Sequence, residues 1–218
     1  MSLLVLLAGL AVAAGQGDSQ EALRGFDSTV ALGAGHIFPL GDDRYNRDWP
    51  GQAVFEVSVA PEGPRTRVSA SDLATVETGY ETVSLIVLEA RTDGWLRLAA
   101  GWLHTSALAR ARPALRFEPW ERLFQSSEIS PLYFRTQVRH ALRVGPSEST
   151  ALRTWIPADA GLYSIEAIEF RGDWARVRLN IPSGYCDFSG PPPVVREGWV
   201  RWRDSERGPW LWYYTRGC

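Results

Sequence analysis

The residues that could support acid–base or metal chemistry are few in this chain. Its three histidines are His36, His104 and His140. Asp42 and Asp43 follow closely after His36, which is a weak hint of an acid–base or metal site. No His-x-x-x-His spacing, no Gly-x-Ser-x-Gly elbow and no phosphate-binding glycine loop occurs. The sequence therefore predicts no metal, no cofactor and no catalytic residue.

Aromatic side chains, by contrast, are abundant and follow a pattern. The chain contains 10 Trp, 7 Tyr and 8 Phe. Residues 91–108 read RTDGWLRLAAGWLHTSAL, in which Trp95 and Trp102 each follow a glycine directly. Glycine allows a turn or a close backbone approach where a Cβ would clash. Tryptophan packs a broad apolar face and keeps its N–H near a polar rim. The pattern indicates a strongly bent hairpin.

Short strands must position these tryptophans. Residues 53–59 alternate between apolar and polar side chains, which predicts a half-buried strand, and residues 65–70 predict a second one. Residues 83–90 form the strongest predicted strand in the first half, before a Thr-Asp-Gly turn. His104 falls at a surface or turn-capping position just after the second Gly-Trp pair.

The remaining segments are less regular. We expect residues 18–52 to be an irregular N-terminal segment with one or two short strands, because Gly and Asp are frequent there. Residues 111–138 should connect two units and pack against them. Trp120 and Phe124 predict a helical turn in this connection, and the prolines around it prevent a long helix.

The tryptophan hairpin recurs later in the chain. Residues 163–179 align with residues 85–98 when Trp174 is placed on Trp95. Gly198 and Trp199 then correspond to the second Gly-Trp pair. The second copy carries an insert at 180–196, which we expect to form a long surface loop because loops tolerate insertions.

Residues 139–203 resemble the bacterial SH3-like (SH3b) domain family. Residues 141–147 (ALRVGPS) are similar to the opening strand of that family, and 155–161 (WIPADAG) to its next turn. Residues 83–108 match only the second half of the pattern. The resemblance implies a mainly β chain with two small SH3-like barrels in tandem. The first, degenerate unit would span 53–110, and the second would span 139–218 and end in a C-terminal hairpin.

The resemblance also implies a function. Such domains bind extended peptides, so we expect an exported, non-enzymatic module that recognises cell-wall peptide (peptidoglycan) or an envelope protein. The candidate ligand-binding residues are Trp95, Trp102, Trp174, Trp199 and Tyr163. The plain alternative is that these aromatic side chains fill a core. A second alternative is an envelope peptidoglycan hydrolase with an N-terminal catalytic segment around His36, because SH3-like domains often accompany such enzymes.

The compartment is indicated by the first residues and by the cysteines. Residues 1–17 have the short apolar run and small-residue end of a signal peptide, although no basic residue precedes the run. We therefore expect a periplasmic or secreted protein without stable membrane insertion after cleavage. A disulfide between Cys186 and Cys218 would suit that compartment, with free structural thiols and a catalytic thiol as the alternatives.

The charge balance bears on nucleic acid as a partner. The formal net charge is −2, whereas nucleic-acid binding needs a basic stripe for phosphate contacts. The sequence leaves both the specific ligand and the oligomeric state open.

Overall fold

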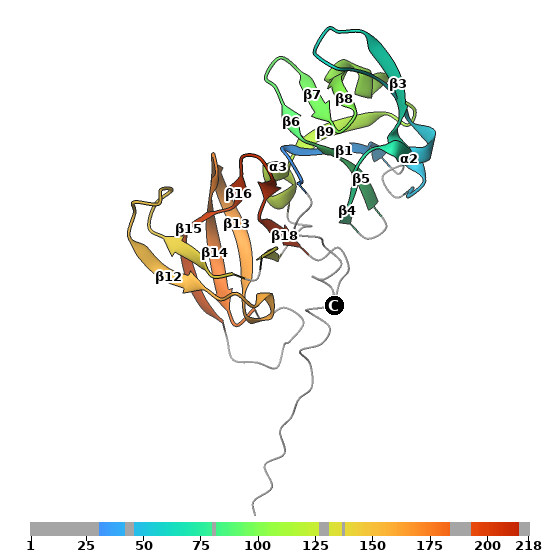
Figure 1. Ribbon diagram of the computed structural model, residues 1–218. Helices are drawn as coiled ribbons and strands as arrows, with labels where there is room; N and C mark the ends of the chain where they lie inside the picture. Colours follow the sequence, from blue (N-terminus) through green and yellow to red (C-terminus); the bar gives the residue numbers. More distant parts are fainter. Residues whose placement is uncertain are drawn as a thin grey trace, which may run out of the picture.

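The computed structural model describes residues 31–41, 46–79, 82–126, 131–136, 138–183 and 193–213 (Figure 1). The predicted signal peptide at 1–17, Asp42, Asp43 and both cysteines of the predicted disulfide lie outside these residues. Strands dominate the described chain and form four antiparallel sheets. Its helices are all short, and none is long and apolar enough to cross a membrane.

A five-stranded sheet contains the first tryptophan hairpin. Its strand order is β3-β2-β8-β7-β6. The strands are β2 (Val54–Ser58), β3 (Arg65–Ser69), β6 (Glu89–Ala90), β7 (Trp95–Leu98) and β8 (Gly101–His104). The predicted alternation is confirmed for Phe55, Glu56 and Val57, which are buried, exposed and buried. It ends there, because Ser58 is buried and Val59 is 91% exposed.

A four-stranded sheet lies beside it in the order β4-β5-β1-β9. The strands are β1 (Gly35–Pro39), β4 (Thr75–Gly79), β5 (Thr82–Val87) and β9 (Leu115–Pro119). The predicted strand at 83–90 is broken at Leu88, so that β5 belongs to this sheet and β6 to the five-stranded sheet. The chain thus bends at Leu88 and passes from the four-stranded sheet into the five-stranded sheet. β1 lies in the N-terminal segment for which short strands were expected.

The second half of the chain forms a seven-stranded sheet in the order β12-β11-β15-β14-β13-β10-β18. The strands are β10 (Leu132–Phe134), β11 (His140–Arg143), β12 (Leu152–Ile156), β13 (Ser164–Arg171), β14 (Trp174–Ile181), β15 (Val194–Arg201) and β18 (Leu211–Tyr213). A small hairpin of β16 (Arg203–Asp204) and β17 (Gly208–Pro209) precedes β18. The loop of the insert is shorter than expected, because β14 and β15 continue their ladder as far as Ile181 and Val194.

The strands of the two halves pair in the same order. We call residues 31–119 unit 1 and residues 131–213 unit 2. β2, β3, β7, β8 and β9 of unit 1 correspond to β11, β12, β14, β15 and β18 of unit 2. The break at Leu88 corresponds to a register shift in β13 between Ala167 and Glu169. The strands of the described residues form separate sheets and no closed barrel.

The buried side chains form two cores, and the core of unit 2 also includes Leu32, Val76 and Ile86 of unit 1. Phe55, Val57 and Leu103 belong to the core of unit 1. The core of unit 2 contains Trp120 and Phe124 from α3 (Trp120–Phe124), the helical turn predicted for the connection. Four other short helices are α2 (Trp49–Gln52), η2 (Ala70–Asp72), η3 (Thr105–Arg110) and η4 (Ala160–Leu162). The connection is therefore packed against its neighbours, as expected.

Contacts also join the two units. The Trp120 indole N–H donates to the Leu32 carbonyl at 2.9 Å. The Leu32 N–H in turn donates to the Arg207 carbonyl of unit 2 at 2.7 Å. Arg203 forms an ion pair with Glu121 of α3 at 3.2 Å. The start of unit 1 and the connection are thus anchored on unit 2.

Candidate functional site

The outward face of the five-stranded sheet is the candidate site. Successive side chains of a strand point to opposite faces, so Trp102 and His104 share one face of β8 and Leu103 points into the core. Trp95 lies opposite His104, and Ser58 lies opposite Trp102. The pairing of β2 with β8 therefore joins the β2–β3 hairpin and the β7–β8 hairpin in one surface.

This surface is hollowed into a cavity of about 600 Å³, which we call the unit 1 groove. Its size lies within the range of ordinary ligand sites. β2, β3, β7, β8 and η3 supply its walls. Its polar and aromatic lining includes Glu56, Glu62, Arg65, Arg67, Trp95, Trp102, His104 and Arg110.

The glycine before Trp102 is required by a close approach of two strands. Gly101 has φ of +139°, and a Cβ at this position would lie 2.6 Å from the Ser58 carbonyl oxygen. Unit 2 repeats the arrangement, because a Cβ at Gly198 would lie 2.7 Å from the Arg143 carbonyl oxygen. Each Gly-Trp pair thus lets the backbones meet while the tryptophan stays on the outward face.

His104 fixes the position of Trp95. The His104 Nδ1 accepts a hydrogen bond from the Ser106 N–H at 3.2 Å, and Nε2 lies 3.3 Å from the Asp93 carbonyl oxygen. These partners assign the proton to Nε2. The ring caps η3, as the sequence indicated, and meets the Trp95 indole edge to face with centroids 5.3 Å apart. The half-buried indole therefore has a rigid neighbour.

Trp102 has a cationic neighbour. The Arg91 guanidinium carbon lies 5.9 Å from the centroid of the Trp102 ring. Arg91 is itself held by Asp93 through a contact of 2.7 Å. Trp102 is half-buried, so part of its indole faces the groove.

Charged side chains from β3 and η3 complete the walls. Arg65 pairs with Glu56 at 3.4 Å, and both side chains are more than half exposed. Arg67 and Arg110 line the groove without an ion pair among the described residues. Glu62, in the turn between β2 and β3, has φ of +64°, an unusual value for a residue other than glycine.

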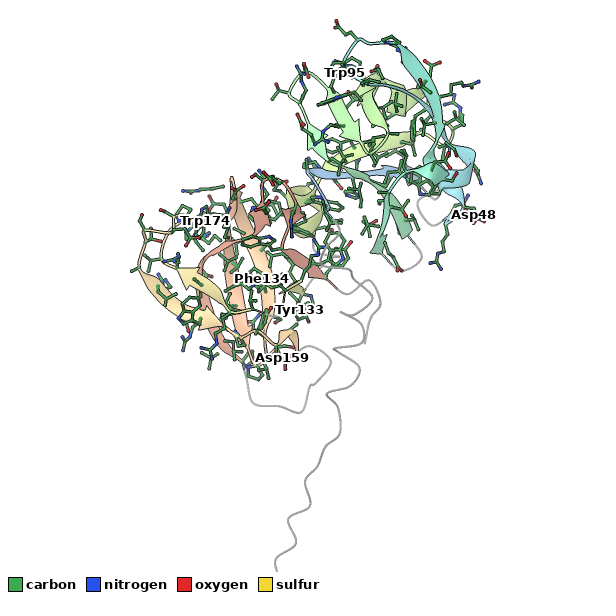
Figure 2. All side chains as sticks on the ribbon, viewed as in Figure 1. Asp48, Trp95, Tyr133, Phe134, Asp159 and Trp174 are labelled. Atoms are coloured by element: carbon green, nitrogen blue, oxygen red, sulfur yellow. The ribbon has the colours of Figure 1, made fainter. Side chains whose placement is uncertain are left out.

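The two candidate tryptophans of unit 2 lie elsewhere. Trp95 and Trp174 are in different lobes of the molecule (Figure 2). Trp174 is half-buried opposite Arg201, and Trp199 is 7% exposed beneath Arg171, whose guanidinium carbon lies 5.1 Å from the ring centroid. The structure therefore brings Trp95 and Trp102 together but leaves Trp174 and Trp199 apart from them.

Tyr163 is an interior residue. Its side chain is fully buried, and its hydroxyl accepts a hydrogen bond from the Phe134 N–H at 3.0 Å. It precedes β13 and corresponds to no residue of the unit 1 groove. We leave it out of the site because its ring faces the core of unit 2.

His36, the candidate base of the hydrolase alternative, is buried between aromatic rings. It stacks on Phe38 and Trp120 at centroid distances of 4.9 and 4.8 Å. Its Nδ1 lies 3.1 Å from the Ser84 hydroxyl, and its Nε2 lies 3.9 Å from Glu118. This is a hydroxyl–imidazole–carboxylate order, but Ser84 has no exposed surface on which a substrate could bind.

The titration of His36 follows from this environment. Burial lowers its pKa to about 3, and the nearby Arg116 adds to the shift. Among the described residues, no group of three or more His, Cys, Asp or Glu side chains is arranged to hold a metal ion.

Sequence reasoning missed the polar half of the groove. Glu56, Arg65 and Arg67 lie on the predicted strands, and all three side chains are exposed. What brings them beside Trp102 is the pairing of β2 with β8. No local pattern indicates that pairing, because it joins segments far apart in the chain.

Comparisons with known proteins found no match of this chain to any family model, curated protein or solved structure.

Proposed function

We propose that this chain is an exported, non-enzymatic binding module of the cell envelope, built from two SH3-like domains. In this proposal the unit 1 groove recognises an extended peptide, either of the cell wall or of a partner protein. Residues 1–17 act as the signal peptide and direct the chain to the periplasm or the medium.

The order of elements supports the SH3-like part of the proposal. A strand, a polar turn, a Gly-Trp strand, a tight turn and a second Gly-Trp strand run from β6 to β8. A short helical turn, η3, follows. β13, β14 and β15 repeat the strands, with the same two tryptophans at the start of β14 and within β15. The repeated pairing makes a duplicated domain the simplest explanation.

The observation that carries the binding function is the convergence of Trp95 and Trp102 on one groove. Aromatic walls suit an extended peptide, because they bury its apolar side chains while its backbone remains solvated or hydrogen-bonded. His104 and Arg91 hold the two indoles in place. Preorganised walls lose little side-chain entropy when a ligand binds.

The hydrolase alternative draws on fewer features. A nucleophile or base must reach its substrate, and His36 and Ser84 are both buried beneath aromatic side chains. We therefore place the function in the unit 1 groove. If His36→Gln abolished a lytic activity measured on cell walls without changing the fold, the hydrolase would replace the binding module.

Binding to purified peptidoglycan tests the proposal. We expect the wild-type protein to sediment with insoluble peptidoglycan, and Trp102→Ala to reduce its apparent affinity at least tenfold. Trp155→Ala is the matched control, because Trp155 is a 51% exposed indole on β12 of unit 2, outside the groove. Thermal melts of each variant separate lost binding from lost folding. A wild-type protein that stays in the supernatant at every pH tested would count against the cell-wall version.

A further inference from the structure

The walls of the unit 1 groove carry more positive than negative charge. Arg65, Arg67 and Arg110 contribute three guanidinium groups, and Glu56 and Glu62 contribute two carboxylates. Arg65 and Glu56 neutralise one another at 3.4 Å. Two arginines then remain, Arg67 on β3 and Arg110 on η3, and the only other carboxylate in the lining is that of Glu62. The groove therefore has an unmatched cation.

The aromatic and cationic parts of the groove lie on different strands. Arg67 is on β3, and Trp102 and Trp95 are on β8 and β7. In the strand order β3-β2-β8-β7, three strand spacings separate β3 from β7, which is about 14 Å at ~4.8 Å per spacing. An extended peptide covers that distance with about four residues.

We propose that the groove selects extended peptides that carry a carboxylate about four residues from an apolar side chain. Arg67 and Arg110 bind the carboxylate, and Trp102 and Trp95 bind the apolar side chain. The planar guanidinium fork matches a carboxylate through two parallel hydrogen bonds. This inference rests on the proposed function and adds the chemical class of its ligand.

Unit 2 shows that these charges are not needed for the fold. Glu56 lies opposite Arg67 in unit 1, and the corresponding pair in unit 2 is Ala141 opposite Trp155. The two residues still pair on adjacent antiparallel strands although neither is charged, and the ladder of unit 2 shifts register only beyond them, between Leu142 and Arg143. Arg67 is therefore specific to the surface of unit 1, as a ligand contact would be.

Chemically modified cell wall tests the inference. Purified peptidoglycan is compared with the same material after its carboxylates have been amidated with carbodiimide and ammonia. We expect the wild-type protein to bind native peptidoglycan at least tenfold more tightly than amidated peptidoglycan. Arg67→Gln/Arg110→Gln should bind both forms with the same low affinity. Arg153→Gln is the control, because Arg153 is exposed on β12 of unit 2.

Synthetic peptides distinguish the two sources of a carboxylate. Three pentapeptides share an N-terminal acetylated tryptophan. One has a glutamate at position five and an amidated end, one has glutamine and a free C-terminal carboxylate, and one has glutamine and an amidated end. Both carboxylate peptides are expected to bind more tightly than the neutral one. Tighter binding of one carboxylate peptide shows whether the groove prefers a side-chain or a C-terminal carboxylate. Moving the glutamate to position two should remove the gain in affinity over the neutral peptide.

The outcomes separate the inference from the proposed function. If the wild type binds native and amidated peptidoglycan equally and Trp102→Ala reduces both, the groove binds peptides but does not read a carboxylate, and the inference is overturned alone. If the wild type binds neither the wall nor any pentapeptide, both proposals are overturned. If the Arg67→Gln/Arg110→Gln variant keeps the full preference, the carboxylate binds elsewhere and the inference is again wrong.

Discussion

Units 1 and 2 share their strand pairing but present different surfaces. The shared features lie where the backbone demands a particular residue. Gly101 and Gly198 each allow a neighbouring strand to approach. Trp102 and Trp199 each lie beside an arginine, Arg91 in unit 1 and Arg171 in unit 2. These repeated features identify the parts of the hairpin that the fold requires.

The differences lie on the outward faces. Trp102 borders an open groove, whereas Trp199 is nearly covered. On the outward face of unit 2, Arg178 pairs with both Glu166 at 2.7 Å and Glu197 at 3.4 Å. These hydrogen bonds and charges raise the pKa of Arg178 above its usual value. Arg178 of unit 2 is thus paired within its own surface, whereas Arg67 and Arg110 of the unit 1 groove have no ion pair among the described residues.

The largest expected effect concerns two histidines, the buried His36 of unit 1 and the half-buried His140 of unit 2. His36 stacks on Trp120, and His140 stacks on Phe134 with centroids 3.5 Å apart. Burial lowers the pKa of His36 to about 3 and that of His140 to about 4. The unfolded chain takes up both protons near pH 6.5 and the native chain does not, so stability falls as the pH drops below 6.5.

Together the two histidines should cost about 2–3 kcal/mol between pH 6.5 and 5, at about 1.4 kcal/mol per pH unit for His36 once the unfolded chain is protonated. His140 contributes the smaller share, because it is partly exposed and solvent screens its charge. Urea unfolding at each pH measures this loss. His36→Gln and His140→Gln should each flatten the pH dependence, whatever their effect at pH 7. A slope that stays unchanged in both variants would show that neither histidine is responsible.

The next largest effect concerns the two close approaches. Gly101→Ala and Gly198→Ala should each destabilise the protein by about 2–3 kcal/mol, because the new Cβ would overlap a carbonyl oxygen of the neighbouring strand. Gly51→Ala is the matched control, since a Cβ there meets nothing within 4 Å. Chemical denaturation checks all three variants. Similar losses of stability at Gly101 and Gly198 would support the structural equivalence of the two hairpins. A substitution tolerated at only one of them would contradict that equivalence.

A smaller effect, a difference of about 1.5 kcal/mol in the free energy of unfolding, distinguishes the two partner tryptophans. Trp199→Ala should lower the free energy of unfolding by about 3 kcal/mol, because it removes a nearly buried ring. Trp102→Ala should cost roughly half as much, since its ring is only half-buried. Binding should respond in the opposite order, with the larger loss for Trp102→Ala. Equal losses of stability and of binding in both variants would contradict the division of roles.

The smallest effect concerns an ion pair that both units repeat. Glu89 pairs with Arg97 at 3.2 Å, and Glu169 pairs with Arg176 at 3.6 Å. Exposed pairs of this kind contribute about 0–1 kcal/mol, so Glu89→Gln and Glu169→Gln should each change stability by less than about 0.5 kcal/mol. Thermal melts at low and high salt check this. A loss of several kcal/mol in either would mean that the pair holds its hairpin in register.

Several features could be predicted from local sequence alone. Period-two alternation predicted β2, and the Gly-Trp pairs predicted the bent hairpins and their recurrence at Trp174 and Trp199. The spacing of Trp120 and Phe124 predicted α3. The long insert loop was overestimated, because residues on both sides of it extend the ladder of β14 and β15. Ladder length depends on the partner strand, which local composition does not reveal.

The candidate site was predicted only in part. Trp95 and Trp102 are close in the chain, so a hairpin brings them together. Tyr163 is also next to a predicted strand, yet its ring is buried and its hydroxyl binds the Phe134 backbone. Alternation alone does not show which of two faces a distant element covers.

The sequence by itself determined the strands, the positions of the tryptophans on them and the need for glycine before Trp102 and Trp199, because these follow from backbone sterics and a side-chain period of two. Only the tertiary structure decided which surface became a groove. It paired β2 with β8 and placed Arg67 on the same outward face as Trp102. The pairing of distant strands depends on burial and register across the whole unit. It hollows the outward face of unit 1 into a groove, whereas the outward face of unit 2 carries the exposed Trp155 and the ion pairs of Arg178.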